Sequence, residues 1–585
     1  MRWSRPLVWL LVLAGSLVPA ALVFLAWDGG KPLAYMLGGL FPLTDGAVWW
    51  ACSLQLAGLG SMPGPYGWVA FDSSGYCTNR PSHAGLLAAL QLLAGFDPHV
   101  LLLLIALLIG IGIAYLSLEA GRTFGWASAA VVYLLVVAYA SQHALSTFTS
   151  ETSGLFLGAV GLAFLVRFIR TEAWHHAWVG IAILSIGLFT RAGAMFALPL
   201  LLAWVAWHAR PLRGRERYSF LFAGTCAAAA GYILQKVLIA LVGDAPSGHF
   251  SNFSVVLYGL ATGSRDWREV LVLYGVETPA PIETMNMIMP LALAKIWEQP
   301  GTFLLTLAAA ERDYLASLFN VPWLSDLRPL LFVLLAIGLL VVLTRIRRLG
   351  YQALALTALG EALSAPLVFD ADGLRVFAAS FPIRCLLVAI AISALVQLLR
   401  RKSSHEPLAV DAGSRRGPAL TLALVVFAAL FSATPLARPF RLAPVPAGDV
   451  ECPDDVRPVI LVVNRASVSF LIDGDSAAPA RPGVISPPLL ERELRDAWFR
   501  DDFTQLPHNT LLLRAIDRHP ENFGKEVSIV WMNADATLRD GDVLRLCLLP
   551  HLTRAPHRRH VRLSYHRFYF ASPVYRPTRG ASVSD

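Results

Sequence analysis

Long apolar runs recur along this chain, and they limit what it can fold into more than any other feature. Each run of about 20 residues is long enough to cross the hydrocarbon core of a membrane as a helix. Of the 585 residues, 56% are hydrophobic and 15% are charged, which excludes an ordinary soluble globular protein. The sequence therefore predicts a polytopic all-α membrane protein with about eleven transmembrane helices. The predicted spans are 7–27, 98–118, 126–142, 152–169, 176–190, 193–208, 218–242, 328–344, 351–369, 376–398 and 419–435.

Arginine is concentrated in every second connection between these spans, which indicates that those connections are cytoplasmic. Arg2 and Arg5 precede the first span, so the N-terminus is expected to be cytoplasmic. That span is too long for a signal peptide and has no convincing cleavage site, so we interpret it as an uncleaved anchor. The net charge of +8 follows from these arginines and does not indicate nucleic-acid binding. The scarcity of lysine beside arginine favours a GC-rich bacterial source and hence an inner membrane, with membrane lipids as partners.

Three longer segments fall on the opposite side of the membrane. They are the first outward loop (28–97), the second outward loop (243–327) and the C-terminal part (438–585). Apolar residues at helical spacing predict interfacial helices in both loops, from Pro81 to Ala94 in the first and with an interruption at Pro290 in the second. In the C-terminal part, the pattern of apolar residues predicts strands over 458–463, 467–472, 526–531 and 543–549, and a helix over 489–499. The chain is thus expected to divide into a transmembrane catalytic domain (1–437) and a periplasmic α/β domain (438–585).

Cysteines support an oxidising compartment on that outer side. Cys52 and Cys77 share the first outward loop, and Cys452 and Cys547 share the C-terminal domain. This even partition favours the disulfides Cys52–Cys77 and Cys452–Cys547 over four free thiols.

Charged residues inside or at the ends of spans are costly and are commonly functional. Most of those in this chain map to the outward side, where they suit a reaction on a charged, lipid-linked substrate. Asp45 is the prominent acid, in the stretch 41–50 directly after the first span, although it can also be read as a helix cap. The other outward candidates are Asp72, Arg80, His83, Glu151, Arg191, Lys236, Asp370, Asp372 and Arg375.

A purely structural interpretation pairs these charges with one another. It joins Glu361, near the middle of a span, to an arginine, and Asp370 to Arg375. Pairing alone does not explain why the charges favour one side of the membrane. The histidines lack metal-ligand spacing, so no metal site is predicted.

Five segments follow one another on the outward side: Asp45-Gly46, Arg80-Pro-Ser-His-Ala-Gly, Ser150-Glu-Thr-Ser-Gly, Gly187-Leu-Phe-Thr-Arg-Ala-Gly and Leu374-Arg-Val-Phe. Their order and sidedness resemble the GT-C superfamily of multi-spanning glycosyltransferases. The likeness covers about residues 1–400. The chain has Asp-Gly where protein O-mannosyltransferases have Asp-Glu, and it lacks the Trp-Trp-Asp of oligosaccharyltransferases because Ala51 follows Trp50.

The resemblance implies an inverting hexosyl- or pentosyltransferase that moves a monosaccharide from a polyprenyl-phosphate donor to an acceptor hydroxyl. The acceptor would be an envelope glycan, a lipid or a protein at the outer face of the inner membrane. Asp45 would be the general base, and a set of cations would hold the donor phosphate. Three further residues would orient the sugar or acceptor. No cofactor or obligatory metal is expected, although a divalent cation is not excluded. The donor phosphate residues would be Arg191, Arg375, Arg80 and Lys236, and the orienting residues Glu151, Asp72 and His83.

Two alternatives remain from the sequence. A polymerase or ligase that uses polyprenyl-diphosphate-linked glycans would also need outward-facing arginines. A transporter of lipid-linked sugars is the non-enzymatic alternative, and the absence of an internal repeat weighs against it.

Overall fold

The computed structural model is built mainly from helices. It describes residues 5–28, 49, 52–53, 56–57, 80–94, 98–145, 147–242, 252–265, 269–274, 282–401, 457–462, 511–516, 526–531, 543–549 and 569–571. The helices of the bundle are α1 (Arg5–Asp28), α6 (Pro98–Phe124), α7 (Trp126–His143), α8 (Glu151–Thr171), α9 (Trp174–Thr190), α10 (Ala197–His208), α11 (Gly214–Val242), α16 (Arg328–Thr344), α17 (Leu349–Asp372) and α18 (Phe381–Arg401). The remaining helices are α5 (Pro81–Ala94), α12 (Asn252–Thr262), α13 (Glu269–Tyr274), α14 (Ile282–Glu298), α15 (Pro300–Ser317) and the 3₁₀ helices η2 (Pro322–Leu327) and η3 (Gly373–Phe377).

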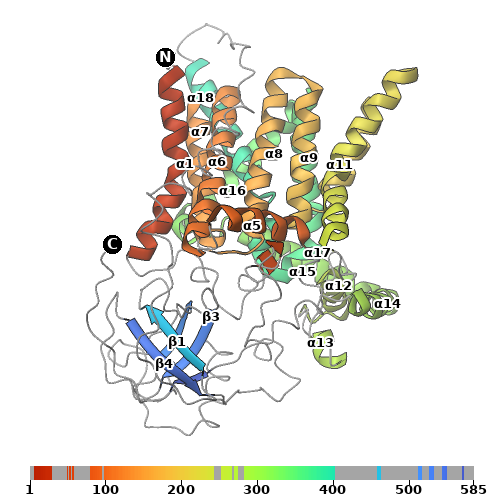
Figure 1. Cartoon of the computed structure of the whole chain (residues 1–585). Helices are drawn as coiled ribbons and strands as arrows, with labels where there is room; N and C mark the ends of the chain where they lie inside the picture. The colour runs from red at the N-terminus through yellow and green to blue at the C-terminus, as the bar shows by residue number, and fades with distance from the viewer. Residues whose placement is uncertain are drawn as a thin grey trace.

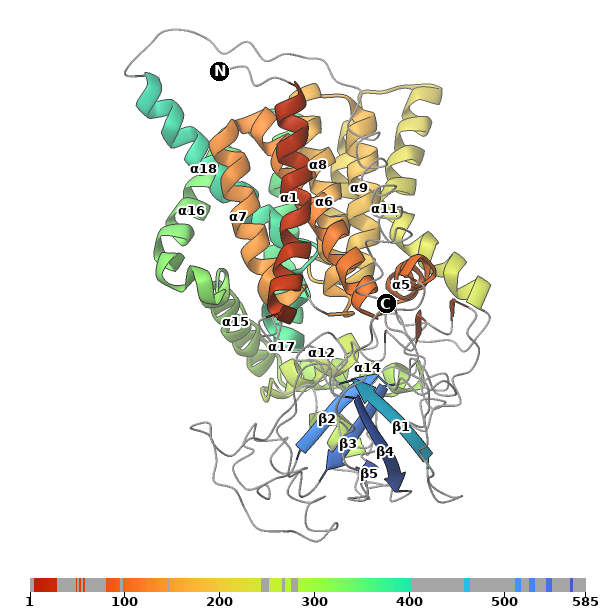
Figure 2. The same cartoon turned by 60° about the vertical axis from the view of Figure 1, so that its left-hand side comes forward.

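The two views in Figures 1 and 2 show that the short helices gather at one end of the bundle. α5 lies across that end, α12 and α14 lie beside it, and the β-sheet lies beyond them. α1 begins at the opposite end and runs toward α5. Because the predicted outward loops supply α5 and α12–α15, we call this the outward end.

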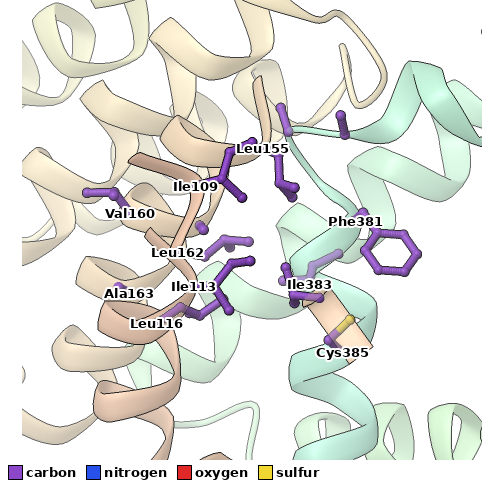
Figure 3. Packing of buried hydrophobic residues seen from close by; sticks show 14 of the residues in the cluster. Ile109, Ile113, Leu116, Leu155, Val160, Leu162, Ala163, Phe381, Ile383 and Cys385 are labelled. Carbon is purple, nitrogen blue, oxygen red and sulfur yellow. The ribbon is translucent and has the colours of Figure 1, made fainter. Parts of the chain in front are cut away.

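Helix α6 occupies the centre of the bundle. Its most apolar stretch is completely buried, as expected for a helix surrounded by others. Figure 3 shows Ile109 and Ile113 of this helix facing Leu155 of α8 and Ile383 of α18. The small side chains of the bundle permit such close packing between helices, as is common in membranes.

A helix occupies each predicted span between residues 7 and 398, while span 419–435 lies outside the described residues. In the described part of the chain, six helices are long and apolar enough to cross a membrane. These are Val100–Phe124, Trp126–His143, Glu151–Thr171, Gly214–Ala240, Leu349–Asp370 and Phe381–Leu398. Span 376–398 was placed too early, because the structure has a 3₁₀ turn and a short break before α18 begins at Phe381. Pro382 in the first turn suits a helix start, since its missing N–H needs no partner there.

The second outward loop folds around a small core of its own. α12, α14 and α15 bury Val255, Leu260, Ile288 and Ala310 together. The predicted interruption at Pro290 is wrong, because α14 continues through that residue. α12 was not predicted at all. The expected helix from Pro81 to Ala94 is confirmed as α5.

The described C-terminal strands form one mixed five-stranded sheet in the order β1-β4-β5-β3-β2. The strands are β1 (Arg457–Val462), β2 (Leu511–Ile516), β3 (Glu526–Trp531), β4 (Val543–Leu549) and β5 (Tyr569–Ala571). β3 and β5 are parallel, and the other neighbouring pairs are antiparallel. Three of these five strands, β1, β3 and β4, were predicted, and two, β2 and β5, were missed. The predicted strand 467–472 and helix 489–499 lie outside the described residues, so the α/β assignment stays a prediction.

Candidate functional site

A single buried carboxylate gathers two of the predicted phosphate-binding arginines. Glu151 is the first residue of α8, and its side chain is only 1% exposed. Its Oε1 atom lies 3.2 Å from Nη2 of Arg191 and 2.6 Å from Nη2 of Arg375. Arg375 also donates a hydrogen bond to the same oxygen through Nε, at 2.7 Å. The three residues are far apart in the sequence and meet at the outward end of the bundle.

The break between α9 and α10 positions Arg191. The backbone of Arg191 is extended, and its N–H still bonds to the Gly187 carbonyl oxygen at 2.9 Å, so the helix ends at this residue. Its Nε also donates to the carbonyl oxygen of Arg375 at 3.4 Å. Arg191 therefore binds both the carboxylate and the backbone of the segment that carries the second arginine.

The short helix η3 carries Arg375. This segment packs closely against its neighbours because they present glycines to its backbone. A Cβ at Gly158 of α8 would lie 1.9 Å from the carbonyl oxygen of Ala379, and one at Gly193 would lie 2.4 Å from that of Val376. Neither distance is possible for a side chain, so only glycine allows this approach. Helix α8 and the turn between α9 and α10 thus enclose the chain around Arg375 closely enough to bring its guanidinium to Glu151.

A third arginine lies at the start of α5. Arg80 donates a hydrogen bond to the hydroxyl of Ser150, the residue before Glu151. It also acts electrostatically on the Glu151 carboxylate. Three guanidinium groups therefore lie around the carboxylate of Glu151. We call Arg80, Glu151, Arg191 and Arg375 the arginine cluster.

His83 fixes α5 to α8 beside the arginine cluster. Its Nε2 donates to the Phe148 carbonyl oxygen at 2.7 Å, so Nδ1 accepts from the Ser153 hydroxyl at 2.7 Å. Burial lowers the pKa of this imidazole to about 3, so it is neutral at physiological pH. Because both ring nitrogens bind protein groups, we assign His83 a positioning role in place of the predicted sugar-orienting role. The ring of Trp49 packs edge-on against it, with centroids 5.1 Å apart.

Two polar atoms near the arginine cluster are buried without a hydrogen-bond partner among the described residues. One is Oε2 of Glu151, the carboxylate oxygen that the arginines leave open. The other is Nε2 of His143, at the end of α7. Buried polar atoms normally find a partner, so both are candidates to bind a ligand hydroxyl. No sequence pattern selects His143, because a lone histidine at a helix end is common.

The other predicted site residues do not join the arginine cluster in the part of the chain that the structure describes. Lys236 is exposed on α11, with its ammonium 5.5 Å from the ring centroid of Tyr232. Its predicted role in phosphate binding is therefore not supported by its position. Asp45 and Asp72 lie outside the described residues, so their roles stay predictions.

The cysteine predictions are settled only in part. Cys52 is disulfide-bonded. Cys77 and Cys452 lie outside the described residues, and Cys547 is described only as a backbone position in β4. The two pairings therefore stay predictions.

The predicted pairing of Asp370 with Arg375 is wrong. Asp370 instead accepts two hydrogen bonds from Arg265, at 2.8 Å from Nε and 2.6 Å from Nη2. Nη1 of Arg265 binds Asp313 of α15 at 2.7 Å. These hydrogen bonds raise the pKa of Arg265 and lower that of Asp313. Arg265 has a left-handed backbone (φ 58°), which sequence patterns do not reveal.

The predicted pairing of Glu361 with an arginine is confirmed, and the partner is Arg384 of α18. Both side chains are buried. Among the described residues, no group of three or more His, Cys, Asp or Glu side chains gathers as metal ligands. Whether the protein needs a metal stays a prediction.

Comparisons with known proteins found likeness only among solved structures. No protein-family model and no curated protein matches the sequence. The crystal structure of an Archaeoglobus fulgidus oligosaccharyltransferase in complex with Zn and sulfate is 14% identical, with a TM-score of 0.39 over 72% of this chain and 53% of that one. The oligosaccharyltransferase AglB of the same organism, with an inhibitory peptide and a dolichol-phosphate, is 14% identical with a TM-score of 0.36, over 72% and 56%. The apo form is 15% identical with a TM-score of 0.38, over 75% and 56%. This chain therefore spans about half the length of the structures that it matches.

Proposed function

We propose that this protein is an inverting glycosyltransferase of the GT-C type, which transfers a monosaccharide from a polyprenyl-phosphate donor to an acceptor hydroxyl. The reaction would take place at the outer face of a bacterial inner membrane. The arginine cluster at the outward end of the bundle is the single observation that carries the proposal. Buried charges cost free energy in a low-dielectric surrounding, and in membrane proteins they commonly mark a functional site.

The charge of the arginine cluster suits the proposed leaving group. A polyprenyl-phosphate sugar is a phosphodiester with one negative charge. When the bond between the anomeric carbon and the phosphate oxygen breaks, the polyprenyl phosphate departs as a monoester with two. The arginine cluster places three guanidinium groups around Glu151 at this end of the bundle. Fixed positive charge that matches charge developing in the transition state is the usual source of such catalysis.

Arg375 is the arginine best placed to touch the donor phosphate. Its side chain is 23% exposed, whereas that of Arg191 is 3% exposed. A ligand can therefore reach Arg375. Arg191 is buried and contacts the carboxylate of Glu151 and the backbone carbonyl of Arg375. The open Oε2 of Glu151 would accept a hydrogen bond from a sugar or acceptor hydroxyl. This keeps the orienting role predicted for Glu151 and adds the role of counter-ion.

The general base would be Asp45. In this step the acceptor oxygen forms a bond to the anomeric carbon, the phosphate leaves with the electron pair of the broken bond, and the acceptor proton passes to the aspartate. Trp49 lies against His83, which binds α8 beside the arginine cluster. Asp45 is four residues before Trp49, so the two Cα atoms are at most about 14 Å apart. That distance supports a base close to the arginine cluster.

The two rival functions make different demands on this site. A polymerase or ligase would release a polyprenyl diphosphate, so the identity of the released phosphate distinguishes it from monosaccharide transfer. A transporter is expected to bind its cargo near the bilayer midplane. The arginine cluster lies instead at the first residue of α8, at the outward end. Its position therefore favours transfer at the outer face over transport.

Purified protein in lipid nanodiscs would test the proposal. The donor would be the lipid-linked sugar fraction of the source cells, and the acceptor their envelope extract. We expect release of polyprenyl phosphate by the wild type, loss of that release in Asp45→Asn, and no change in Glu298→Gln, which alters an exposed outward acid. Wild-type activity in Asp45→Asn would exclude the base, and release of a diphosphate would favour the rival enzyme. Activity that survives chelation with EDTA is expected if no metal is needed.

The acceptor needs a separate measurement. Mass spectrometry of envelope glycans, lipids and proteins from a deletion strain would show which molecule lacks one sugar residue. A mass difference of a single hexose or pentose is expected. Loss of a whole oligosaccharide would contradict monosaccharide transfer.

A further inference from the structure

A second buried charge pair lies close to η3 and has no part in the proposed chemistry. Nε of Arg384 in α18 donates a hydrogen bond to Oε1 of Glu361 in α17. The hydroxyl of Tyr314 in α15 donates to the same oxygen at 3.0 Å. Nη1 of Arg384 donates to the Leu318 carbonyl oxygen at 3.1 Å, just after α15. Three helices are thus joined through one carboxylate.

Aromatic rings extend this contact to η3. The guanidinium carbon of Arg384 lies 5.1 Å from the ring centroid of Phe377, the last residue of η3, and 5.0 Å from that of Tyr314. The rings of Tyr314 and Phe377 are themselves 5.2 Å apart. Cations over aromatic faces are attracted by the ring quadrupole. Phe377 is only two residues after Arg375, so its position limits that of the arginine.

The pair is not the arrangement expected if stability were its only role. Oε2 of Glu361 and Nη2 of Arg384 are buried and have no hydrogen-bond partner among the described residues. A buried ion pair often stabilises a protein no more than apolar side chains of the same size, and sometimes less. The Glu361–Arg384 pair instead fixes the relative positions of the helices that carry it, because a buried charge is satisfied by its partner only in a few geometries.

We propose that Glu361, Arg384 and Tyr314 form a positioning unit that holds η3, and with it Arg375, in the orientation that binds the donor phosphate. This inference rests on the proposed function. The three residues do not touch the donor. They act through Phe377. Arg191 independently donates a hydrogen bond to the Arg375 carbonyl oxygen. α15, which belongs to the second outward loop, is thereby tied to the phosphate site.

The experiment measures binding of farnesyl phosphate, a short isoprenyl phosphate, to the full chain in nanodiscs, with farnesol as the probe without phosphate. The main variant is Tyr314→Phe, which removes one hydrogen bond and keeps the ring. The double variant Glu361→Met with Arg384→Met removes both charges, so that neither is left buried and unpaired. Glu119→Gln is the matched control, since Glu119 is a buried acid bound to Arg122 and Arg170 far from η3.

We expect Tyr314→Phe, which loses one hydrogen bond, to weaken binding of farnesyl phosphate about threefold, and the double variant, which loses three, about tenfold or more. Binding of farnesol should not change. In an Arg375→Gln background, Tyr314→Phe should have no further effect, because residues that act through one another are not additive. A merely structural role would predict additive losses, so additivity would overturn the inference. Wild-type affinity in the folded double variant would also overturn it.

Hydrogen exchange of η3 separates this inference from the proposed function. Amide exchange at 373–377 should be faster in Tyr314→Phe and in the double variant than in the wild type or Glu119→Gln. If farnesyl phosphate binds neither to the wild type nor to any variant but exchange still rises in the variants, the positioning unit stands and the phosphate role falls. If Arg375→Gln abolishes binding but neither variant changes exchange or affinity, the phosphate role stands and the positioning unit falls.

Discussion

Replacing Arg375 by glutamine tests the assignment of the donor phosphate site most directly. The change keeps a side chain able to hydrogen-bond and removes the guanidinium charge. Glu151 is not left unpaired, because Arg191 remains 3.2 Å from its Oε1. We therefore expect the variant to fold, with a loss of about 1–2 kcal/mol in the free energy of unfolding.

The effect on turnover should be much larger. A hydrogen bond to a charged group contributes about 1.5–3 kcal/mol, which corresponds to a decrease of about 10- to 150-fold in kcat/KM for the donor. Arg375→Lys should recover only part of this activity. A lysine keeps the charge, but it cannot make the two contacts that Nε and Nη2 make with Glu151 while also binding phosphate.

The assay is release of polyprenyl phosphate from the extracted donor lipid by protein in nanodiscs, with thermal unfolding measured on the same samples. Lys236→Gln is the matched control, because it removes an exposed cation that lies outside the arginine cluster. Its kcat/KM should equal that of the wild type. The reasoning fails if folded Arg375→Gln keeps wild-type kcat/KM, or if Lys236→Gln loses as much as Arg375→Gln does.

Two further predictions concern stability. The pKa of His83 falls from 6.5 in the unfolded chain to about 3 in the folded protein, so the unfolded state binds the extra proton and stability falls as the pH decreases below 6.5. Between pH 6.5 and 5 the free energy of unfolding should fall by about 2 kcal/mol because of this group. Thermal unfolding of His83→Gln should therefore depend less steeply on pH over that range than thermal unfolding of the wild type. Equal pH dependence in the two proteins would exclude the assignment. Gly158→Ala should lower the stability by about 1–3 kcal/mol, because its Cβ would overlap a backbone carbonyl beyond η3. Gly301→Ala, where nothing lies within 4 Å of the added carbon, should not lower it.

The sequence predicted the helices of the bundle well because the membrane imposes a simple rule on them. A helix must carry about 20 apolar residues to cross, and that requirement is visible without any tertiary information. It also grouped Arg191 and Arg375 with Glu151, and the structure places both guanidinium groups at that carboxylate. What it missed depends on contacts between distant segments. In the sequence, Glu151 looks like any acid at the start of a helix. The residues near it in the sequence do not indicate that two arginines contact it.

The errors have similar physical causes. Span 376–398 was extended too far because Val376 and Phe377 are as apolar as the helix that follows them. Hydropathy does not distinguish a buried 3₁₀ turn from a membrane helix. Asp370 was paired with Arg375 because the two are close in the sequence, whereas the structure supplies Arg265 from the second outward loop. Pairings that span 105 residues are decided by packing, which one sequence does not reveal.

The arginine cluster connects the stability of the protein to its proposed activity. Three guanidinium groups lie around the carboxylate of Glu151, and like charges so close together repel one another. The fold holds them in place through further contacts: the glycines that enclose η3, the backbone bond from Arg191, and the link from Arg384 to Phe377. Tertiary structure therefore sets the positions of the guanidinium groups on which the proposed phosphate binding depends.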